Sequence, residues 1–254
     1  MNELVELQQT LYTSRNPTRR WLHITRRELV GEAIQTAPVA ATERALEVGP
    51  GSGVYLPGLC SRFKSVTALD IEPAHIQALA DLAASLPNLD LSVGDVCKTT
   101  WHEPFDLVLC SEVVEHVPDP GAFISGLGRA VRPGGILIFS TPQPFSIMEL
   151  TASVALARPF ISLTRRVYRE AVLPTGHISV MRSPEVLQHL AEARFEVLCS
   201  RYFGLYLPLL AEAGGKFSVA ILKRLEPVLN FCGLSGLLWT QLHVARKQPD
   251  RLTS

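Results

Sequence analysis

The chain has 254 residues, of which 47% are hydrophobic, and its 24 lysines and arginines balance its 24 aspartates and glutamates. This size and composition predict one well-packed α/β domain with elaborations, and the zero net charge argues against a protein that binds nucleic acid by neutralising phosphates. Five scattered cysteines without a CxxC pair indicate neither a disulfide framework nor a zinc knuckle, so we expect a reducing, cytoplasmic location. Neither a signal peptide nor an uncharged run of membrane-spanning length is recognisable.

A helix is predicted from Pro17 to about Thr36, because apolar residues recur there with helical spacing. Arginines gather on another face of this helix. We expect that face to be a solvated surface, with an acidic substrate or an anionic lipid headgroup as the alternative interpretation. Residues 1–37 are interpreted as an N-terminal helical cap, and residues 38–254 as the main domain.

Three glycines at alternate positions, Gly49, Gly51 and Gly53, follow a short apolar run at residues 45–48. The pattern predicts a buried strand, a tight turn and the start of a helix over residues 54–63. Glycine has no Cβ, so the backbone can adopt positive φ and a ligand can lie against it, next to the unpaired N–H groups that open a helix. The turn favours a nucleotide or nucleoside cofactor, although a purely structural turn is an alternative.

A second strand is predicted at residues 65–69 and ends at Asp70. This acid lies about 20 residues beyond the glycines, the offset at which a carboxylate can accept hydrogen bonds from ribose hydroxyls. Asp70 could instead be the N-cap of a helix that begins near Pro73, since acidic residues are common before helices. The two roles could coexist.

The rest of the chain continues the alternation of strands and helices. Further strands are predicted at 89–93, 105–110, 136–140, 195–202 and 237–245, and further helices at 74–86, 120–131 and 183–193. The alternation predicts right-handed crossovers and a mostly parallel sheet with helices on both faces. The last strand is reached through a connection that could reverse its direction. Two insertions are expected: a lid at about 142–182, over the edge of the sheet where such folds bind ligands, and an apolar segment at about 203–234.

Separated signals fall in one order along the chain: Glu47-x-Gly49-x-Gly51-x-Gly53, Asp70, Gly94-Asp95 and Arg132-Pro133-Gly134-Gly135. Together with the seven strands they resemble the class I S-adenosylmethionine-dependent methyltransferases, over about residues 40–200 and the last strand. The resemblance implies an α/β fold with a Rossmann-like seven-stranded, mostly parallel sheet whose last strand is antiparallel. It also implies S-adenosyl-L-methionine as the cofactor.

The same resemblance implies a set of cofactor-binding residues. They are Glu47, Gly49, Gly51, Gly53, Asp70, Ile71, Asp95, Val96 and Ser111. In this family the glycine turn lies beside the methionine part of the cofactor, the first acid holds the ribose, the next residue packs on the adenine, and the Asp-Val pair recognises the adenine edge. The cofactor carries a carboxylate suited to N–H groups at a helix start, and a cationic ammonium and sulfonium suited to acids such as Glu47.

A nicotinamide-dependent oxidoreductase is the alternative enzyme. Its fingerprint places the third glycine three positions after the second, where this chain has Val54. The chain also lacks a second set of parallel βαβ units. Two further alternatives are a non-catalytic protein that keeps the methyltransferase fold for interactions, and a methyltransferase acting on RNA or protein, which would need a basic groove.

The segment Glu112-Val113-Val114-Glu115-His116 follows the fourth strand and resembles the ubiquinone-biosynthesis O-methyltransferase group and its relatives. Its three polar residues are spaced i, i+3 and i+4, so one helical turn would place all of them on one face. With His177 from the lid they could form a site of two carboxylates and two imidazoles for a divalent cation such as Mg²⁺, as in some relatives. Carboxylates that cap a turn and a packing histidine are the alternative interpretation.

We therefore predict methyl transfer to a small-molecule acceptor, on an oxygen of an aromatic or lipid-like metabolite. A phenol has an ordinary pKa near 10, so a base or a metal is needed at neutral pH. His177 is the first candidate for this base and His116 the second. No nucleic-acid partner is expected. The stretch 217–225 could contact a membrane interface or pair with a second subunit in a homodimer. The quinone enzymes have no such long apolar insertion, so we do not assign their substrate to this chain.

Overall fold

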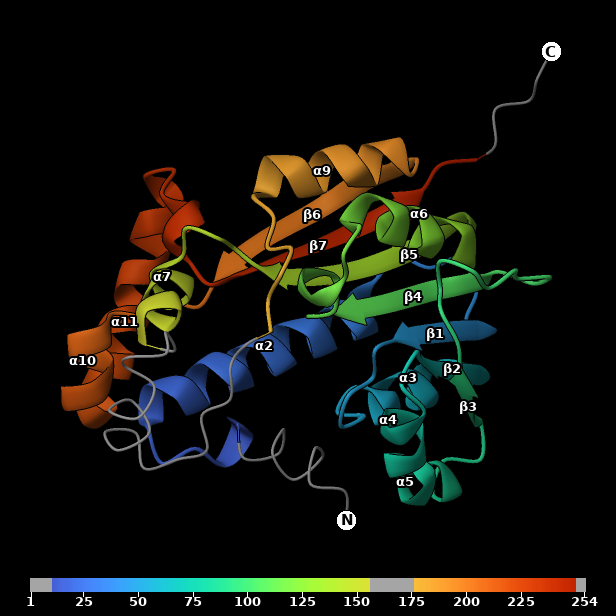
Figure 1. The fold of residues 1–254 in the computed structure, drawn as a ribbon, viewed down its shortest axis with the longest axis horizontal. Coiled ribbons are helices and arrows are strands. Elements are labelled where there is room, and N and C mark those ends of the chain that lie inside the picture. Colours follow the sequence, from blue (N-terminus) through green and yellow to red (C-terminus); the bar gives the residue numbers. More distant parts are fainter. Residues whose placement is uncertain (1–10, 156–175, 250–254) are drawn as a thin grey trace.

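The structure, a computed structural model, describes residues 11–155 and 176–249. At its centre lies a seven-stranded sheet with the order β3-β2-β1-β4-β5-β7-β6 (Figure 1). The strands are β1 (Arg44–Val48), β2 (Ser65–Asp70), β3 (Leu89–Val93), β4 (Phe105–Ser111), β5 (Val131–Pro142), β6 (Phe195–Phe203) and β7 (Thr240–Lys247). Neighbours among β1 to β5 pair in parallel, whereas β7 is antiparallel to both β5 and β6. The predicted fold class, with its reversed last strand, is confirmed.

Helices cover both faces of this sheet. They are α2 (Pro17–Thr36), α3 (Leu56–Arg62), α4 (Pro73–Ala78), α5 (Ala80–Ala84), α6 (Pro120–Ala130), α7 (Ile147–Ala155), α9 (Ser183–Glu192), α10 (Pro208–Ala213) and α11 (Gly215–Phe231), with short 3₁₀ turns η1 (Val114–His116) and η2 (Ser235–Leu237). Buried side chains of α6 and α9 pack on one face of the sheet, and those of α2, α3 and the residue between α4 and α5 pack on the other. The sheet is therefore enclosed between two layers of helices, as Figure 1 shows.

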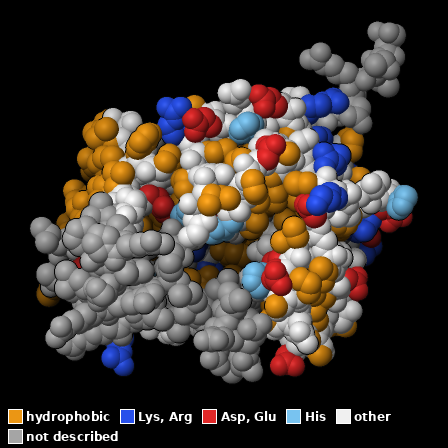
Figure 2. All heavy atoms as spheres, viewed as in Figure 1, with side chains coloured by type: hydrophobic (Ala, Val, Ile, Leu, Met, Phe, Trp, Pro, Cys, Tyr) orange, Lys and Arg blue, Asp and Glu red, His pale blue; other side chains and the backbone are white. Residues whose placement is uncertain are grey.

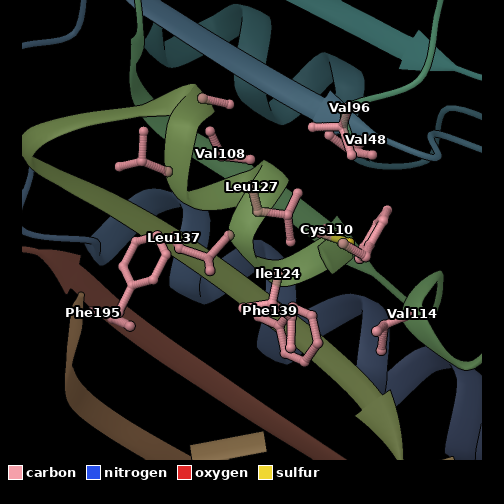
Figure 3. Close-up of a cluster of buried hydrophobic side chains, with 14 of the residues drawn as sticks. Val48, Val96, Val108, Cys110, Val114, Ile124, Leu127, Leu137, Phe139 and Phe195 are labelled. Atoms are coloured by element: carbon pink, nitrogen blue, oxygen red, sulfur yellow. The ribbon is translucent and has the colours of Figure 1, made fainter. Parts of the chain in front are cut away.

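The hydrophobic core beneath α6 explains why the sequences of β4 and β5 are apolar. Figure 3 shows Ile124 and Leu127 of α6 among Val108, Leu137 and Phe139, which come from β4 and β5. All five side chains are fully buried. Burial of each stabilises the fold by about 1.5–3 kcal/mol, so the two central strands are rigid supports for whatever lies at their carboxyl ends.

Helix α2 begins and ends at the residues that the sequence predicts. The Asn16 side chain accepts hydrogen bonds from the N–H groups of Thr18 and Arg19, and Pro17 occupies the first helical position. The expectation of a solvated arginine face is wrong for Arg26, because its side chain is only 11% exposed. This arginine belongs to the candidate site described below.

The structure also corrects several element boundaries. The predicted helix 74–86 is two short helices, α4 and α5, that meet at Leu79. The strand predicted at 136–140 begins earlier, because residues 132–135 also lie inside β5, where the pairing with β4 shifts register. The described part of the predicted lid contains α7, while residues 156–175 lie outside the described residues. The apolar insertion is helical: α10 and α11 pack against the start of α2 in a third hydrophobic cluster.

Candidate cofactor and acceptor site

The glycine turn leaves the carboxyl end of β1 with an unusual backbone. Gly49, Gly51 and Gly53 all have positive φ, at 69°, 52° and 72°, a region that side chains with a Cβ rarely adopt. The Gly49 N–H donates to the carbonyl of Leu69 at 2.9 Å, which ties the turn to β2. A Cβ added at Gly49 would overlap the Val113 side chain. Glycine is required here by both conformation and space.

Glu47 brings a carboxyl group into the interior next to this turn. It lies on β1 and is 2% exposed, and its Oε2 has no hydrogen-bond partner among the described residues. Burial disfavours the ionised form and raises the pKa of this carboxyl to about 8. A buried carboxyl oxygen without a partner lowers the stability of the fold unless a ligand supplies a hydrogen bond or an opposite charge. A cationic ligand beside β1 would do so.

Asp70 ends β2 with its carboxylate held at the sheet edge. One oxygen accepts the N–H of Glu72 at 2.8 Å, and the other lies 3.2 Å from Nδ1 of His75. The N-cap of α4 is Glu72, so the interpretation of Asp70 as that cap is wrong. Each oxygen keeps a lone pair beyond these contacts, and the carboxylate can still accept bonds from a ligand.

The residues predicted to contact the adenine differ in how far they are exposed. Ile71 is 69% exposed directly after Asp70, so a large aliphatic face is open to a flat ring. The Asp95 carboxylate accepts the N–H of Cys97 at 2.9 Å, and this bond lowers the pKa of the Asp95 carboxyl. Val96, however, is buried in the core cluster (Figure 3). Only its main chain remains to meet a ligand.

Glu112 departs from the predicted arrangement. It has a positive φ of 58° just after β4, and only Val114–His116 forms a short 3₁₀ turn. Its carboxylate pairs with Arg26 at 2.5 Å and accepts the Ser140 hydroxyl at 3.1 Å. The prediction that Glu112, Glu115 and His116 share one helical face is therefore wrong, because the left-handed backbone turns Glu112 toward α2.

Ser111, the residue before Glu112, lies at the carboxyl end of β4. Its hydroxyl is 2.9 Å from that of Ser140 on β5. Burial raises the pKa of the Tyr55 hydroxyl, in the segment that follows the glycine turn, well above its usual value. The tyrosine therefore stays neutral and can donate a hydrogen bond at neutral pH.

Glu115 is buried on the other side of the same turn. Its Oε2 accepts the Thr141 hydroxyl at 3.1 Å, while Oε1 has no partner among the described residues. Burial, and then the Glu112 carboxylate, raise the pKa of the Glu115 carboxyl well above its usual value. The carbonyl of Glu115 accepts the N–H groups of Ile178 and Ser179. These bonds hold the chain just after His177 against the turn.

His116 and His177 lie together, as the sequence predicts. Their ring centroids are 5.1 Å apart in an edge-to-face arrangement. Nδ1 of His177 is 3.0 Å from a carboxylate oxygen of Glu149, and Nδ1 of His116 is 3.2 Å from the carbonyl of Gly176. With Glu115, the two histidines offer three ligand atoms within 4.8 Å of one another, and Glu112 is not among them.

Three neighbours of the site were not predicted. Glu149 of α7 accepts Trp239 Nε1 at 3.1 Å with the oxygen that does not face His177. The Arg26 guanidinium lies 4.9 Å from the Trp239 ring centroid while it pairs with Glu112. No local motif marks these residues. Glu149 precedes its histidine by 28 positions, and Arg26 is one of several arginines on the same helix.

The predicted cofactor-binding residues and the two histidines lie at the same edge of the sheet. The carboxyl ends of β1 and β4 are neighbours, with Val48 paired to Cys110. Figure 2 shows a hollow at the middle of this face, where Figure 1 has the ends of β1 and β4. Open α/β sheets bind ligands at this edge.

Comparisons with known proteins agree with this geometry. A methyltransferase domain family matches residues 46–139. The ubiquinone biosynthesis O-methyltransferase of Albidiferax ferrireducens is 30% identical over 175 residues, which cover 65% of this chain and 68% of that enzyme. The protein of the same name from Paracidovorax citrulli is 28% identical over 165 residues, covering 62% of this chain and 65% of the relative.

A solved structure supports the fold. The N-methyltransferase NodS of Bradyrhizobium japonicum WM9, in complex with S-adenosyl-L-homocysteine, has a TM-score of 0.59 at 15% identity and covers 98% of this chain and 100% of NodS. Fold, site and matches together define a class I S-adenosylmethionine-dependent methyltransferase. Within that class, the chain belongs to the family that includes the ubiquinone biosynthesis O-methyltransferases. In the part of the chain that the structure describes, no helix is both long and apolar enough to cross a membrane.

Proposed function

We propose that the protein transfers the methyl group of S-adenosyl-L-methionine to a small molecule, at an oxygen of an aromatic or lipid-like acceptor. The observation that carries this proposal is the buried Glu47 carboxyl beside a glycine turn with positive φ, because its Oε2 has no hydrogen-bond partner among the residues that the structure describes. Burying such a group lowers the stability of the fold unless a ligand interacts with it. A cation is the complement of a carboxylate, and the glycine backbone leaves room for one.

The residues present fit this cofactor. Glu47 would face its cationic part, the open main chain at Gly49 and Gly51 would lie along it, Asp70 would accept the ribose hydroxyls, and Ile71 would cover a face of the adenine. When bound, the sulfonium supplies an activated methyl group. The protein then contributes by holding acceptor and cofactor in line and by keeping water out, which can account for a large part of a displacement's barrier.

His177 is the proposed base for the acceptor hydroxyl. Glu149 contacts its Nδ1 at 3.0 Å, so the carboxylate fixes the ring orientation and leaves Nε2 to receive a proton. Glu149 is itself held by Trp239. His116 is the second candidate, since its ring lies against that of His177 and its Nδ1 faces the Gly176 carbonyl.

A divalent cation is the second candidate for activating the acceptor. Glu115, His116 and His177 offer one oxygen and two nitrogens within 4.8 Å of one another, and Glu115 Oε1 is buried without a partner in the described chain. Each histidine has Nδ1 beside an oxygen acceptor, the arrangement that orients metal-binding imidazoles. These three residues fit a cation without the predicted fourth ligand, Glu112. The cation would anchor the acceptor hydroxyl and lower its pKa.

Calorimetric titration with S-adenosyl-L-homocysteine tests the cofactor site. We expect micromolar binding by the parent and at least about a tenfold loss in Asp70→Asn, because a carboxylate bonded to hydroxyls contributes about 1.5–3 kcal/mol per bond. Asp90→Asn is the matched control: it removes an exposed carboxylate from the adjacent strand, β3, and should bind like the parent. Absence of binding, or equal affinity in all three proteins, would remove the proposal.

The acceptor and the cation need separate experiments. Extracts incubated with the protein and cofactor should yield a product that is heavier by one CH₂, and the same product should be absent from Gly49→Ala. Elemental analysis after dialysis against Mg²⁺, Mn²⁺ or Zn²⁺ should detect bound metal in the parent and less in Glu115→Gln. Equal metal content in the two proteins, with turnover unchanged by a chelator, would leave His177 as the base.

A further inference from the structure

Helix α11 is oriented by the contacts of one face. The Ser218 hydroxyl lies 3.0 Å from that of Thr18 on α2, and Leu222 is fully buried in the third cluster. The Glu226 carboxylate turns inward and accepts the N–H groups of Gly204 and Leu205 at 2.9 and 3.2 Å. These contacts come from three successive turns, so the rotation of the helix about its axis is fixed.

A second face of α11, about 100° around the helix axis from the packed one, is apolar and exposed. It consists of Phe217, Ile221, Leu225, Val228 and Phe231 and continues into Leu234. The steps of four, four, three and three place the five helical residues on one side. Phe217 is 83% and Phe231 93% exposed, and Figure 2 shows hydrophobic side chains gathered over this part of the molecule, at the left. A continuous surface of this kind usually marks an interaction site.

The charges around this face have one sign. Arg224 is exposed on this face, and Lys216 and Lys223 are exposed farther around the helix, where Lys223 Nζ lies 6.0 Å from the Trp21 ring centroid. The single carboxylate of α11, Glu226, is held inside. Arg224 lies seven residues from both Phe217 and Phe231, so it projects from the apolar face itself. Aromatic and aliphatic residues with cations and no acid are the composition of helices that lie in the headgroup region of anionic membranes.

A second copy of the chain fits this face less well. A two-fold contact through α11 would place the same patch on both subunits, so Arg224 of one copy would approach Arg224 of the other. Like charges in a contact cost free energy that an anionic surface would instead supply.

We propose that the exposed face of α11 docks the protein on an anionic phospholipid surface, with the helix lying in the plane of the interface. Leu222 of α11 shares the third cluster with Trp239 and with Ile147 and Met148 of α7, and Trp239 bonds Glu149, the partner of His177. The docking face is therefore joined by direct packing to the elements beside the proposed base. This part of the inference rests on the proposed function: a site held at the membrane surface suits an acceptor whose lipid tail stays in the membrane.

Vesicle co-sedimentation of the full chain tests the docking. The vesicles are phosphatidylcholine alone, or an equal mixture of phosphatidylcholine and phosphatidylglycerol. We expect the parent to partition at least about tenfold more strongly onto the anionic vesicles. Phe217→Ser with Phe231→Ser should lose at least about tenfold, because two large apolar groups no longer insert. Arg224→Glu should lose binding to the anionic vesicles only. Leu198→Ser, an exposed apolar residue on β6, is the control and should bind like the parent.

Three results would overturn the proposal: no preference for anionic vesicles, equal binding by the double serine variant, or a dimer in analytical ultracentrifugation that the double serine variant dissociates. Circular dichroism confirms that each variant is folded. Titration with S-adenosyl-L-homocysteine should be the same for the parent and the serine variants, so failure of the docking and failure of the cofactor site are separate outcomes.

Discussion

Glu47→Gln tests how a buried carboxyl controls the stability of the unliganded fold. The pKa of Glu47 rises from 4.5 to about 8 on burial. Between these values the folded chain keeps a proton that the unfolded chain has lost, so the free energy of unfolding falls as pH rises. The slope is about 1.4 kcal/mol per pH unit, and the loss reaches about 5 kcal/mol at pH 8 and above. Below pH 4.5 both states are protonated and this destabilisation is absent. Glutamine has nearly the same shape and does not ionise.

The assay is urea unfolding of both proteins at pH 5.5, 6.5 and 7.5, followed by circular dichroism. We expect the stability of the parent relative to Glu47→Gln to fall by about 2.7 kcal/mol from pH 5.5 to pH 7.5. Other carboxyls with raised pKa, Glu115 and Glu226, are present in both proteins, so their contributions cancel in the difference. A difference that stays constant across this range would show that Glu47 ionises freely in the folded chain, and would refute the reasoning.

Three further outcomes are expected. In the proposed site the positively charged cofactor binds the ionised form of Glu47. Its affinity for the parent should therefore rise from pH 6 to pH 8, and its affinity for Glu47→Gln should stay constant, as measured by calorimetry. Gly49→Ala should lower the free energy of urea unfolding by about 2 kcal/mol, because residue 49 has a φ of 69°. The double variant with Val113→Ala should lose less than the sum of the two single losses, because the smaller side chain at 113 makes room for the added methyl group. Arg26→Met should cost about 3 kcal/mol in the same assay, because the half-buried Glu112 carboxylate loses its cation. Glu112→Gln in that background should restore part of the loss; additive losses would contradict the ion pair.

The sequence predicted the sheet well because each strand is marked locally. The run 105–110, which is apolar except for Asp106, is buried on both sides, and Gly49, Gly51 and Gly53 have the positive φ that favours glycine. The helix 74–86 was predicted as one element because its apolar spacing is continuous, yet the chain divides at Leu79. Periodicity does not reveal such a break, since packing against β2 and β3 decides it.

The site was predictable where a motif carries it and not where tertiary contacts do. His116 and His177 were placed together through the resemblance to the ubiquinone-biosynthesis O-methyltransferase group, and the structure brings them together. Glu112 was misplaced because its spacing from Glu115 implies a helix, whereas the ion pair with Arg26 and a left-handed backbone direct it elsewhere. That pair joins residues 86 positions apart, and no pattern within a short window contains this information.

The two hydrogen bonds to the Glu115 carbonyl have a consequence for how acceptor choice could change. Ile178 and Ser179 are fastened by main-chain N–H groups, which every residue except proline possesses, so His177 keeps its place whatever side chains stand at 178 and 179. Substitutions there would change the surroundings of the proposed base without moving it. If His177 is the base, as proposed, acceptor specificity can diverge while the position of this histidine is inherited intact.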